Sequence, residues 1–315
     1  MSSKAQENPT KSWVETPPRS PQIRRLSEQL ISSIPWLDKI ANTMQGGVSK
    51  LYGRPGQPAY VVKDFLNGKW VGHALHPALV ALPIGSWTAT LVLDLAWLAD
   101  DKNNGMARAA DITMWVGLAG ALGAATTGVT SWVDTDGPER RTGIWHGLLN
   151  GVVTLLNFGS AALRLTGRRR TAITVASTAY ALSLYTGYLG GELGYSAGIG
   201  VNHVAWEGGS DDYVAVLDED ALKPGELTRV DAAGIPAVLL KDGKNIYAIA
   251  ATCSHLGGPL DEGRCENGVV YCPWHNSGFS IKDGSVVNSP AVYAQPTFAV
   301  RTRNGKIELR RLEHA

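Results

Sequence analysis

Four long stretches of the chain carry almost no charge, and they constrain its fold more than any other feature. Apart from Asp94 in the first stretch, they contain no Asp, Glu, Lys or Arg, and they cover residues 70–99, 112–133, 142–163 and 171–191. Each is as long as the roughly 20 apolar residues with which an α-helix crosses the hydrocarbon core of a bilayer. They predict a transmembrane bundle of four helices over residues 70–204, in contact with the lipid bilayer.

The composition of these stretches supports the membrane assignment. They are rich in Gly, Ala, Ser and Thr, as in GLAGALGAATTGVTS, which lets helix backbones approach closely in lipid. Tryptophans that suit the membrane interface lie near several of their ends. The alternative is a soluble helical domain that is buried on all sides.

Residues 1–69 are polar and contain no hydrophobic export signal. An amphipathic helix on the membrane surface or on the bundle is one interpretation, with Pro35 expected to kink it. Its apolar residues recur at roughly helical spacing, at Leu26, Leu30, Leu37, Ile40 and Met44. The alternative is a tail that folds weakly or not at all.

Whole-chain numbers exclude two other classes of protein. The net charge is only +1 over 315 residues, which argues against a nucleic-acid partner because such proteins usually carry a basic patch. Three cysteines cannot build a paired disulfide framework. The chain is long enough for about two domains.

The pattern changes after the bundle. Residues 205–222 are acidic and are expected to form a linker that leads into a new domain. Three segments then alternate apolar and polar residues around Asp-Gly or Asn-Gly pairs, which favour tight hairpin turns. We expect an all-β antiparallel domain over residues 211–312.

This β domain contains the motif that carries chemistry. Cys253-Ser254-His255 is followed, after a spacer, by Cys272-Pro273-Trp274-His275. Two thiolates and two imidazoles suit a tetrahedral zinc ion. They equally suit a 2Fe-2S cluster in which one iron takes both cysteines and the other iron takes both histidines.

The flanking residues resemble the Rieske family. CSHLGGPL and VVYCPWHNSGFSIKDGSVVNSPA are similar to its two cluster-binding loops. The resemblance implies a 2Fe-2S cluster with Cys253 and Cys272 on the buried iron, and with His255 and His275 on the outer iron near the surface. A redox partner protein, either a reductase or an acceptor, is then expected to dock at the two imidazoles.

Several positions indicate which Rieske type this is. Gly258 and Trp274 stand where quinol-oxidising relatives carry a disulfide, so the chain resembles the ferredoxin type. Ser277 stands where high-potential relatives place a hydroxyl that bonds a bridging sulfide, and the resemblance implies that it tunes the cluster. Asn276 replaces a frequent Gly and is expected to alter the backbone of the loop.

The expected function is one-electron transfer by a membrane-anchored iron–sulfur protein. The alternatives are a membrane redox sensor or assembly factor, and a ferredoxin component of an oxygenase system. A catalytic oxygenase subunit would need a further iron held by two histidines and a carboxylate. Only 40 residues follow His275 and His314 is the sole histidine among them, so no catalytic residue is assigned.

Four histidines accompany the bundle. We expect His73, His76, His146 and His203 to lie on the membrane face that carries the β domain. Candidate roles are ligation of haem b or another metal, with His73 or His76 paired to His146, hydrogen bonding at the mouth of the bundle, and quinone contact or proton transfer. Residues 67–203 also resemble a family of bacterial four-helix membrane domains without an established function, which implies the bacterial inner membrane.

The orientation of the chain in the membrane is argued both ways. Positive charges in the short loops mark the face opposite the β domain as cytoplasmic, at Lys102, Arg108, Arg168, Arg169 and Arg170. Cluster insertion and the lack of an export signal favour a cytoplasmic β domain, which is our expectation.

Overall fold

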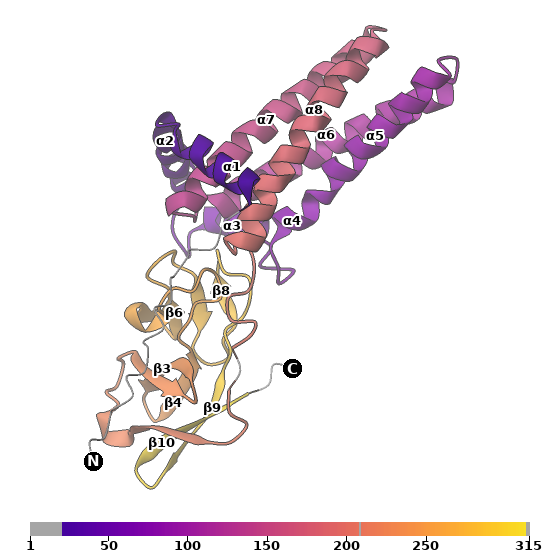
Figure 1. Ribbon diagram of the computed structural model, residues 1–315. Helices are drawn as coiled ribbons and strands as arrows, with labels where there is room; N and C mark the ends of the chain where they lie inside the picture. Colours follow the sequence, from indigo (N-terminus) through magenta and orange to yellow (C-terminus); the bar gives the residue numbers. More distant parts are fainter. Residues whose placement is uncertain (1–20, 208, 313–315) are drawn as a thin grey trace, which may run out of the picture.

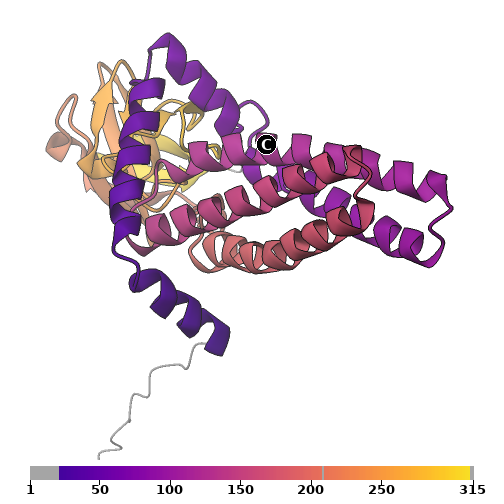
Figure 2. The ribbon, with the colours of Figure 1, turned by 90° about the horizontal axis from the view of Figure 1, so that it is seen from above.

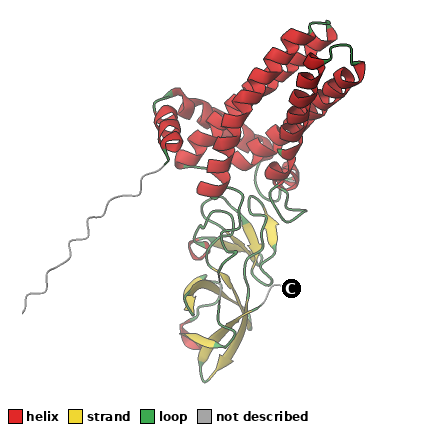
Figure 3. Cartoon of the chain, turned by 45° about the vertical axis from the view of Figure 1, so that its right-hand side comes forward, coloured by secondary structure: helices red, strands yellow, loops and turns green. Residues whose placement is uncertain are grey.

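The computed structural model describes residues 21–207 and 209–312. Its long helices and its strands lie in separate halves of the molecule, as Figure 3 shows. Long helices form a bundle at one end, and the strands form a second body below it (Figure 1). The predicted fold class, a helical bundle followed by an all-β antiparallel domain, is confirmed.

Four long helices make the bundle. The helical segments in this part of the chain are α4 (Leu75–Leu79), α5 (Ala81–Ala99), α6 (Asn104–Trp132), α7 (Gly137–Leu165), α8 (Arg169–Gly191) and a turn of π-helix, η1 (Glu192–Ser196). Among the described residues, three helical stretches are long and apolar enough to cross a membrane: Leu75–Ala99, Asn104–Trp132 and Gly137–Leu165. The fourth helix, α8, is less apolar because Tyr, Ser, Thr and Gly occupy much of it. Its transmembrane assignment stays a prediction.

The bundle packs through small residues. A Cβ atom added to Gly117 would lie 2.4 Å from the Trp87 ring, and one added to Gly120 would lie 2.7 Å from Leu82. Only glycine allows this approach between α5 and α6. Large apolar side chains point outward instead, at Val92, Leu95, Ile112, Trp115, Leu122, Leu155 and Leu184 among others. An outer surface of this kind matches lipid.

Charged residues join the four helices at the end of the bundle that is distant from the strands. Arg164 on α7 pairs with Asp94 on α5, and both side chains are almost fully buried. Arg164 also contacts Asp111 on α6 at 3.1 Å. Arg169 on α8 contacts Asp94 at 3.4 Å and Asp111 at 2.5 Å. This four-residue ion cluster compensates charges that would be costly at membrane depth.

Three shorter helices precede the bundle: α1 (Gln22–Ser32), α2 (Trp36–Tyr52) and α3 (Pro58–Asn67). The expected amphipathic helix is thus present, and it is divided before Trp36 because Pro35 lacks a backbone N–H donor. Leu37 and Ala41 pack against Trp132 and Ile144 of the bundle. Seen from above, α1 projects beside the bundle (Figure 2). Residues 1–20 of the polar N-terminal region lie outside the described residues.

The β domain consists of three small antiparallel sheets with strand orders β1-β10-β9, β2-β3-β4 and β5-β6-β7-β8. The strands are β1 (Val214–Asp218), β2 (Thr228–Ala232), β3 (Ile235–Asp242), β4 (Asn245–Ala250), β5 (Arg264–Glu266), β6 (Val269–Tyr271), β7 (Gly278–Ser280), β8 (Val286–Asn288), β9 (Phe298–Arg303) and β10 (Lys306–Arg311). Short 3-10 helices are η2 (Glu219–Ala221) and η3 (Leu260–Glu262). The predicted hairpin turns occur between β3 and β4, β7 and β8, and β9 and β10.

Candidate metal centre

Two similar loops present the four candidate ligands. The first follows β4 and the second joins β6 to β7. In the first loop the Gly257 N–H donates to the Cys253 carbonyl at 2.8 Å, and in the second the Asn276 N–H donates to the Cys272 carbonyl at 3.0 Å. Each cysteine therefore starts a tight turn that brings the following histidine to the same side.

Each turn contains a residue with a left-handed backbone conformation, at the fourth position after the cysteine. Gly257 has φ +77° and Asn276 has φ +65°. Asn adopts this conformation more readily than most residues with a side chain. The expectation that Asn276 alters the loop is therefore wrong, because Asn276 takes the left-handed conformation that a Gly would take.

The two thiols form one buried pair. Cys253 and Cys272 are 1% and 2% exposed, and neither forms a disulfide. A hydrogen bond between them lowers the pKa of Cys272 to about 6, with the amides of Trp274 and His275 adding to the effect. The same bond, then burial, raises the pKa of Cys253. Backbone amides directed at a sulfur favour thiolate, the form that binds iron.

The two imidazoles form a second pair. The ring centroids of His255 and His275 lie 5.0 Å apart, with ring planes at 84°. Two imidazoles on one tetrahedral metal, with metal–nitrogen bonds of about 2 Å, have centroids about 5 Å apart. Burial lowers the pKa of His255 well below its usual value. The ring is thus neutral, as a metal ligand must be.

A third segment, residues 289–293, holds both loops. The Ser254 hydroxyl donates to the Tyr293 carbonyl at 2.7 Å. The Ala291 N–H donates to the Ser277 hydroxyl at 3.0 Å. Ser277 is fully buried and its oxygen accepts this bond, so its own proton is available to another acceptor. A 2Fe-2S cluster fits the donor set: two thiols for one iron, two imidazoles for the other, and a buried hydroxyl beside them.

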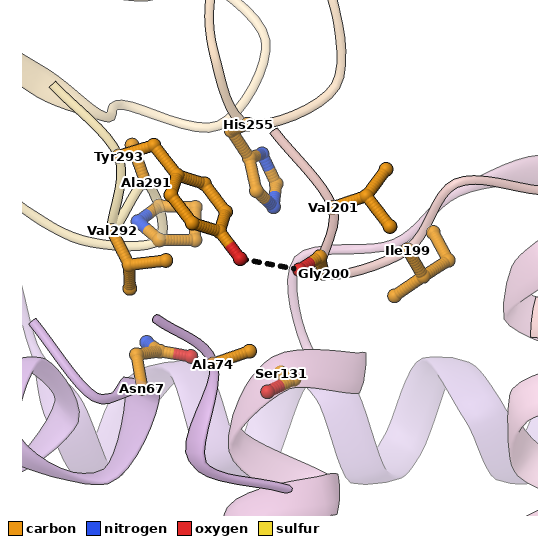
Figure 4. A pocket seen from close by; sticks show the side chains of 11 residues that line it. Asn67, Ala74, Ser131, Ile199, Gly200, Val201, His255, Ala291, Val292 and Tyr293 are labelled. Atoms are coloured by element: carbon orange, nitrogen blue, oxygen red, sulfur yellow. Dashed lines mark hydrogen bonds between the residues drawn. The ribbon is translucent and has the colours of Figure 1, made fainter. Parts of the chain in front are cut away.

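From the sequence we expected both imidazoles to lie at the surface. In the structure they are not open to solvent. The side chain of His275 is only 11% exposed, and its Nε2–H donates to Asp136, between α6 and α7, at 3.0 Å. The His255 ring points into an interdomain cavity of about 30 Å³, which Asn67, Ala74 and Ser131 line from the helical side (Figure 4). The face on which a partner was expected to dock is therefore covered by the helical domain.

Hydrogen bonds fix this contact between the two domains. The Tyr60 hydroxyl donates to the Ser289 carbonyl at 2.8 Å, and the Ser289 N–H donates to Asp64 at 2.9 Å. The Tyr293 hydroxyl also donates to the Gly200 carbonyl at 3.1 Å (Figure 4). Burial is the main cause of the raised pKa of Tyr60, so the hydroxyl stays protonated as a donor.

The four histidines of the helical domain are distributed unevenly. His76 and His146 lie close together, with ring centroids 6.5 Å apart. His73 is exposed and bonds the adjacent Ala74 carbonyl. His203 donates through Nε2 to the Gly198 carbonyl, and its backbone N–H donates to the Ser254 carbonyl of the first cluster loop. The sequence predicted that either His73 or His76 would be paired with His146. The structure places the ring of His76 next to that of His146.

Comparisons with known proteins identify both domains. Residues 212–299 match the Rieske [2Fe-2S] domain, and residues 72–203 match a family described as predicted membrane protein (DUF2231). The class defined by fold and site is thus an iron–sulfur protein with a membrane domain. Through its C-terminal domain, the chain belongs to the Rieske [2Fe-2S] family.

The individual relatives described here each match less than a third of this chain. Ferredoxin CarAc of Metapseudomonas resinovorans is 30% identical over 30% of this chain and 90% of its own length. The ferredoxin component of biphenyl 2,3-dioxygenase from Rhodococcus jostii is 34% identical over 25% of this chain and 75% of its own. Apoptosis-inducing factor 3 of Mus musculus is 30% identical over 30% of this chain, but the match spans only 16% of that protein.

Proposed function

We propose that this protein is a membrane-anchored carrier of single electrons. In this proposal residues 70–204 form the transmembrane domain, residues 205–222 form the linker and the start of the β domain, and residues 211–312 form the Rieske domain. The observation that carries the proposal is the division of the four ligands into two adjacent pairs. Cys253 and Cys272 would hold one iron, and His255 and His275 the other. When bound, the cluster supplies reversible one-electron chemistry.

The residues of this chain determine how the cluster works. The sulfurs are buried among Val238, Leu260 and Phe279, which keeps water from that side. Ser277 would donate a hydrogen bond to a cluster sulfur, and this bond would raise the reduction potential. We expect an intermediate value within the roughly −150 to +300 mV range of Rieske centres.

The test is spectroscopy of the full-length protein purified in detergent. Reduction by dithionite should produce the EPR signal of a Rieske cluster, and iron and sulfide analysis should give two of each per chain. A colourless protein that contains one zinc ion would contradict the proposal. A reduction potential near that of plant-type ferredoxins would contradict the expected tuning.

Two alternatives differ in what happens after reduction. As a ferredoxin component of an oxygenase system, the protein would pass electrons to a separate oxygenase, and the names of the relatives favour this role. As a redox sensor or assembly factor, it would change a partner contact without turnover. Stopped-flow reoxidation by candidate acceptors distinguishes them, because only a carrier returns to the oxidised state at a catalytic rate.

We further propose that the chain lies in a bacterial inner membrane with the Rieske domain in the cytoplasm. The lipid-facing side chains of α5, α6 and α7 support the bilayer as a partner. Protease treatment of sealed inverted vesicles, which expose the cytoplasmic face, should release a fragment that contains the β domain. Release only from right-side-out spheroplasts would reverse the orientation.

We also propose that two of the bundle histidines, His76 and His146, form a pair that ligates haem b or another metal. Their Nδ1–H groups donate to the Ala124 and Thr186 carbonyls at 2.8 Å and 3.0 Å, which leaves each Nε2 as the ligating atom. Asn150, now 3.2 Å from Nε2 of His146, would have to move. A Soret band after haem-replete expression that H146A removes and H73A retains would support the pair; absence of the band would exclude haem.

A further inference from the structure

The imidazole of His275 is held by a residue outside the Rieske domain. Its Nε2–H donates to a carboxylate oxygen of Asp136 at 3.0 Å, across 139 positions of sequence. Asp136 lies in the short connection between Trp132, where α6 ends, and Gly137, where α7 begins. Nearby Asp134 forms a largely buried ion pair with Lys63 of α3 at 2.8 Å. The carboxylate therefore reaches the ring from the connection between α6 and α7, next to this ion pair.

This hydrogen bond has two chemical effects on a cluster ligand. With the proton on Nε2, the Nδ1 lone pair of the ring is free for iron, and the bond sets the orientation of the ring. A carboxylate acceptor also makes the imidazole a stronger electron donor. In addition, its negative charge opposes the arrival of an electron at the cluster. The stronger electron donation and the negative charge both favour the oxidised state of the cluster.

We propose that Asp136 of the membrane domain is a positioning residue for His275: it fixes the ring with Nδ1 toward the iron and lowers the reduction potential of the cluster. This inference rests on the proposed function, because it requires the cluster to be present. It gives the membrane domain a part in setting the redox chemistry, in addition to anchoring the chain.

The same groove provides a matched control. Asp136 and Glu139 both line a groove of about 250 Å³ beside His275, together with Leu256 and Trp274. Both residues carry a negative charge, but the carboxylate bonded to the ring belongs to Asp136. A general effect of charge in the groove would therefore appear in both variants, whereas positioning of the ring would appear only at Asp136.

The experiment is an EPR-monitored redox titration of the full chain in detergent at one pH. Asp136→Asn should keep the iron and sulfide content, raise the midpoint potential and shift the g values of the reduced cluster. Asp136→Glu, which keeps the carboxylate, should stay close to the wild-type potential. Glu139→Gln should shift the potential much less than Asp136→Asn. The Asp136 side chain is 84% exposed, so these substitutions leave the fold intact.

The outcomes separate the inference from the proposed function. An unchanged or lowered potential in Asp136→Asn would overturn the inference, and so would an equal rise in Glu139→Gln. If the wild-type protein itself gives no Rieske EPR signal, the proposed function fails instead.

Discussion

The Rieske domain buries its large aliphatic and aromatic side chains, whereas the membrane bundle turns many of its own outward. Leu239, Phe279 and Ile307 are fully buried in the β domain. In the bundle, Leu155 is 71% exposed, and the buried positions include Thr130, which is fully buried. The same physical rule produces both patterns, since each domain presents to its surroundings what those surroundings solvate. The contact between them joins a domain with a buried apolar core to a bundle with an apolar outer surface.

Among substitutions in the two domains, we expect the largest effect from loss of a cysteine at the metal centre of the β domain. Cys272→Ser removes one of the two thiolates of an iron, and we expect complete loss of the cluster and of its EPR signal. Cys265→Ser is the matched control, because Cys265 lies between the loops and should leave the signal unchanged. A Cys272→Ser protein that retains the wild-type spectrum would contradict the ligand assignment.

The second largest effect is expected from the ion cluster of the bundle. Asp94→Asn leaves the buried Arg164 with Asp111 as its remaining carboxylate partner, so we expect a cost of up to about 3–5 kcal/mol, the cost of breaking a buried ion pair. Unfolding of the bundle in detergent, followed by circular dichroism, should show this loss. Asp101→Asn, which removes the exposed partner of Arg170, should cost about 1 kcal/mol or less. Similar losses in the two variants would show that burial of the cluster does not matter.

The opposite packing of the two domains can be tested with two truncations to alanine. Phe279→Ala leaves a cavity in the β domain and should cost about 3 kcal/mol. Leu155 is 71% exposed on the outer surface of the bundle, so Leu155→Ala should change stability by less than about 0.5 kcal/mol. Denaturant titration, with cluster absorbance for the first variant and helical signal for the second, measures both. A large loss in Leu155→Ala would indicate that this face is covered by protein.

The smallest expected effect concerns the contact between the domains. Tyr60→Phe removes the hydrogen bond to the Ser289 carbonyl, which is worth about 1 kcal/mol. Hydrogen exchange of the amides in residues 286–293 should become faster. Tyr213→Phe serves as a control because the Tyr213 ring packs on Arg301 at 3.8 Å within the β domain. Equal exchange in both variants would show that Tyr60 does not hold the contact.

Much of this architecture could be predicted from the chain alone, for reasons that lie in local sequence. Runs without charge predicted the helices, turn pairs predicted the hairpins, and Cys253 with His255 falls within one short motif. The bond from His275 to Asp136 could not be predicted, because it joins segments that no periodicity connects. The pairing of Asp94 with Arg164 was missed for the same reason, and Asp94 read only as an interruption of an apolar run.

The ion cluster also bears on how the bundle is assembled. The hairpin of α5 and α6 contributes two aspartates, Asp94 and Asp111, and the hairpin of α7 and α8 contributes two arginines, Arg164 and Arg169. Each hairpin alone would leave its own members of this cluster without their partners of opposite charge. These four charges compensate one another only when the two hairpins pack together, so we expect assembly of one hairpin to depend on the other during biogenesis.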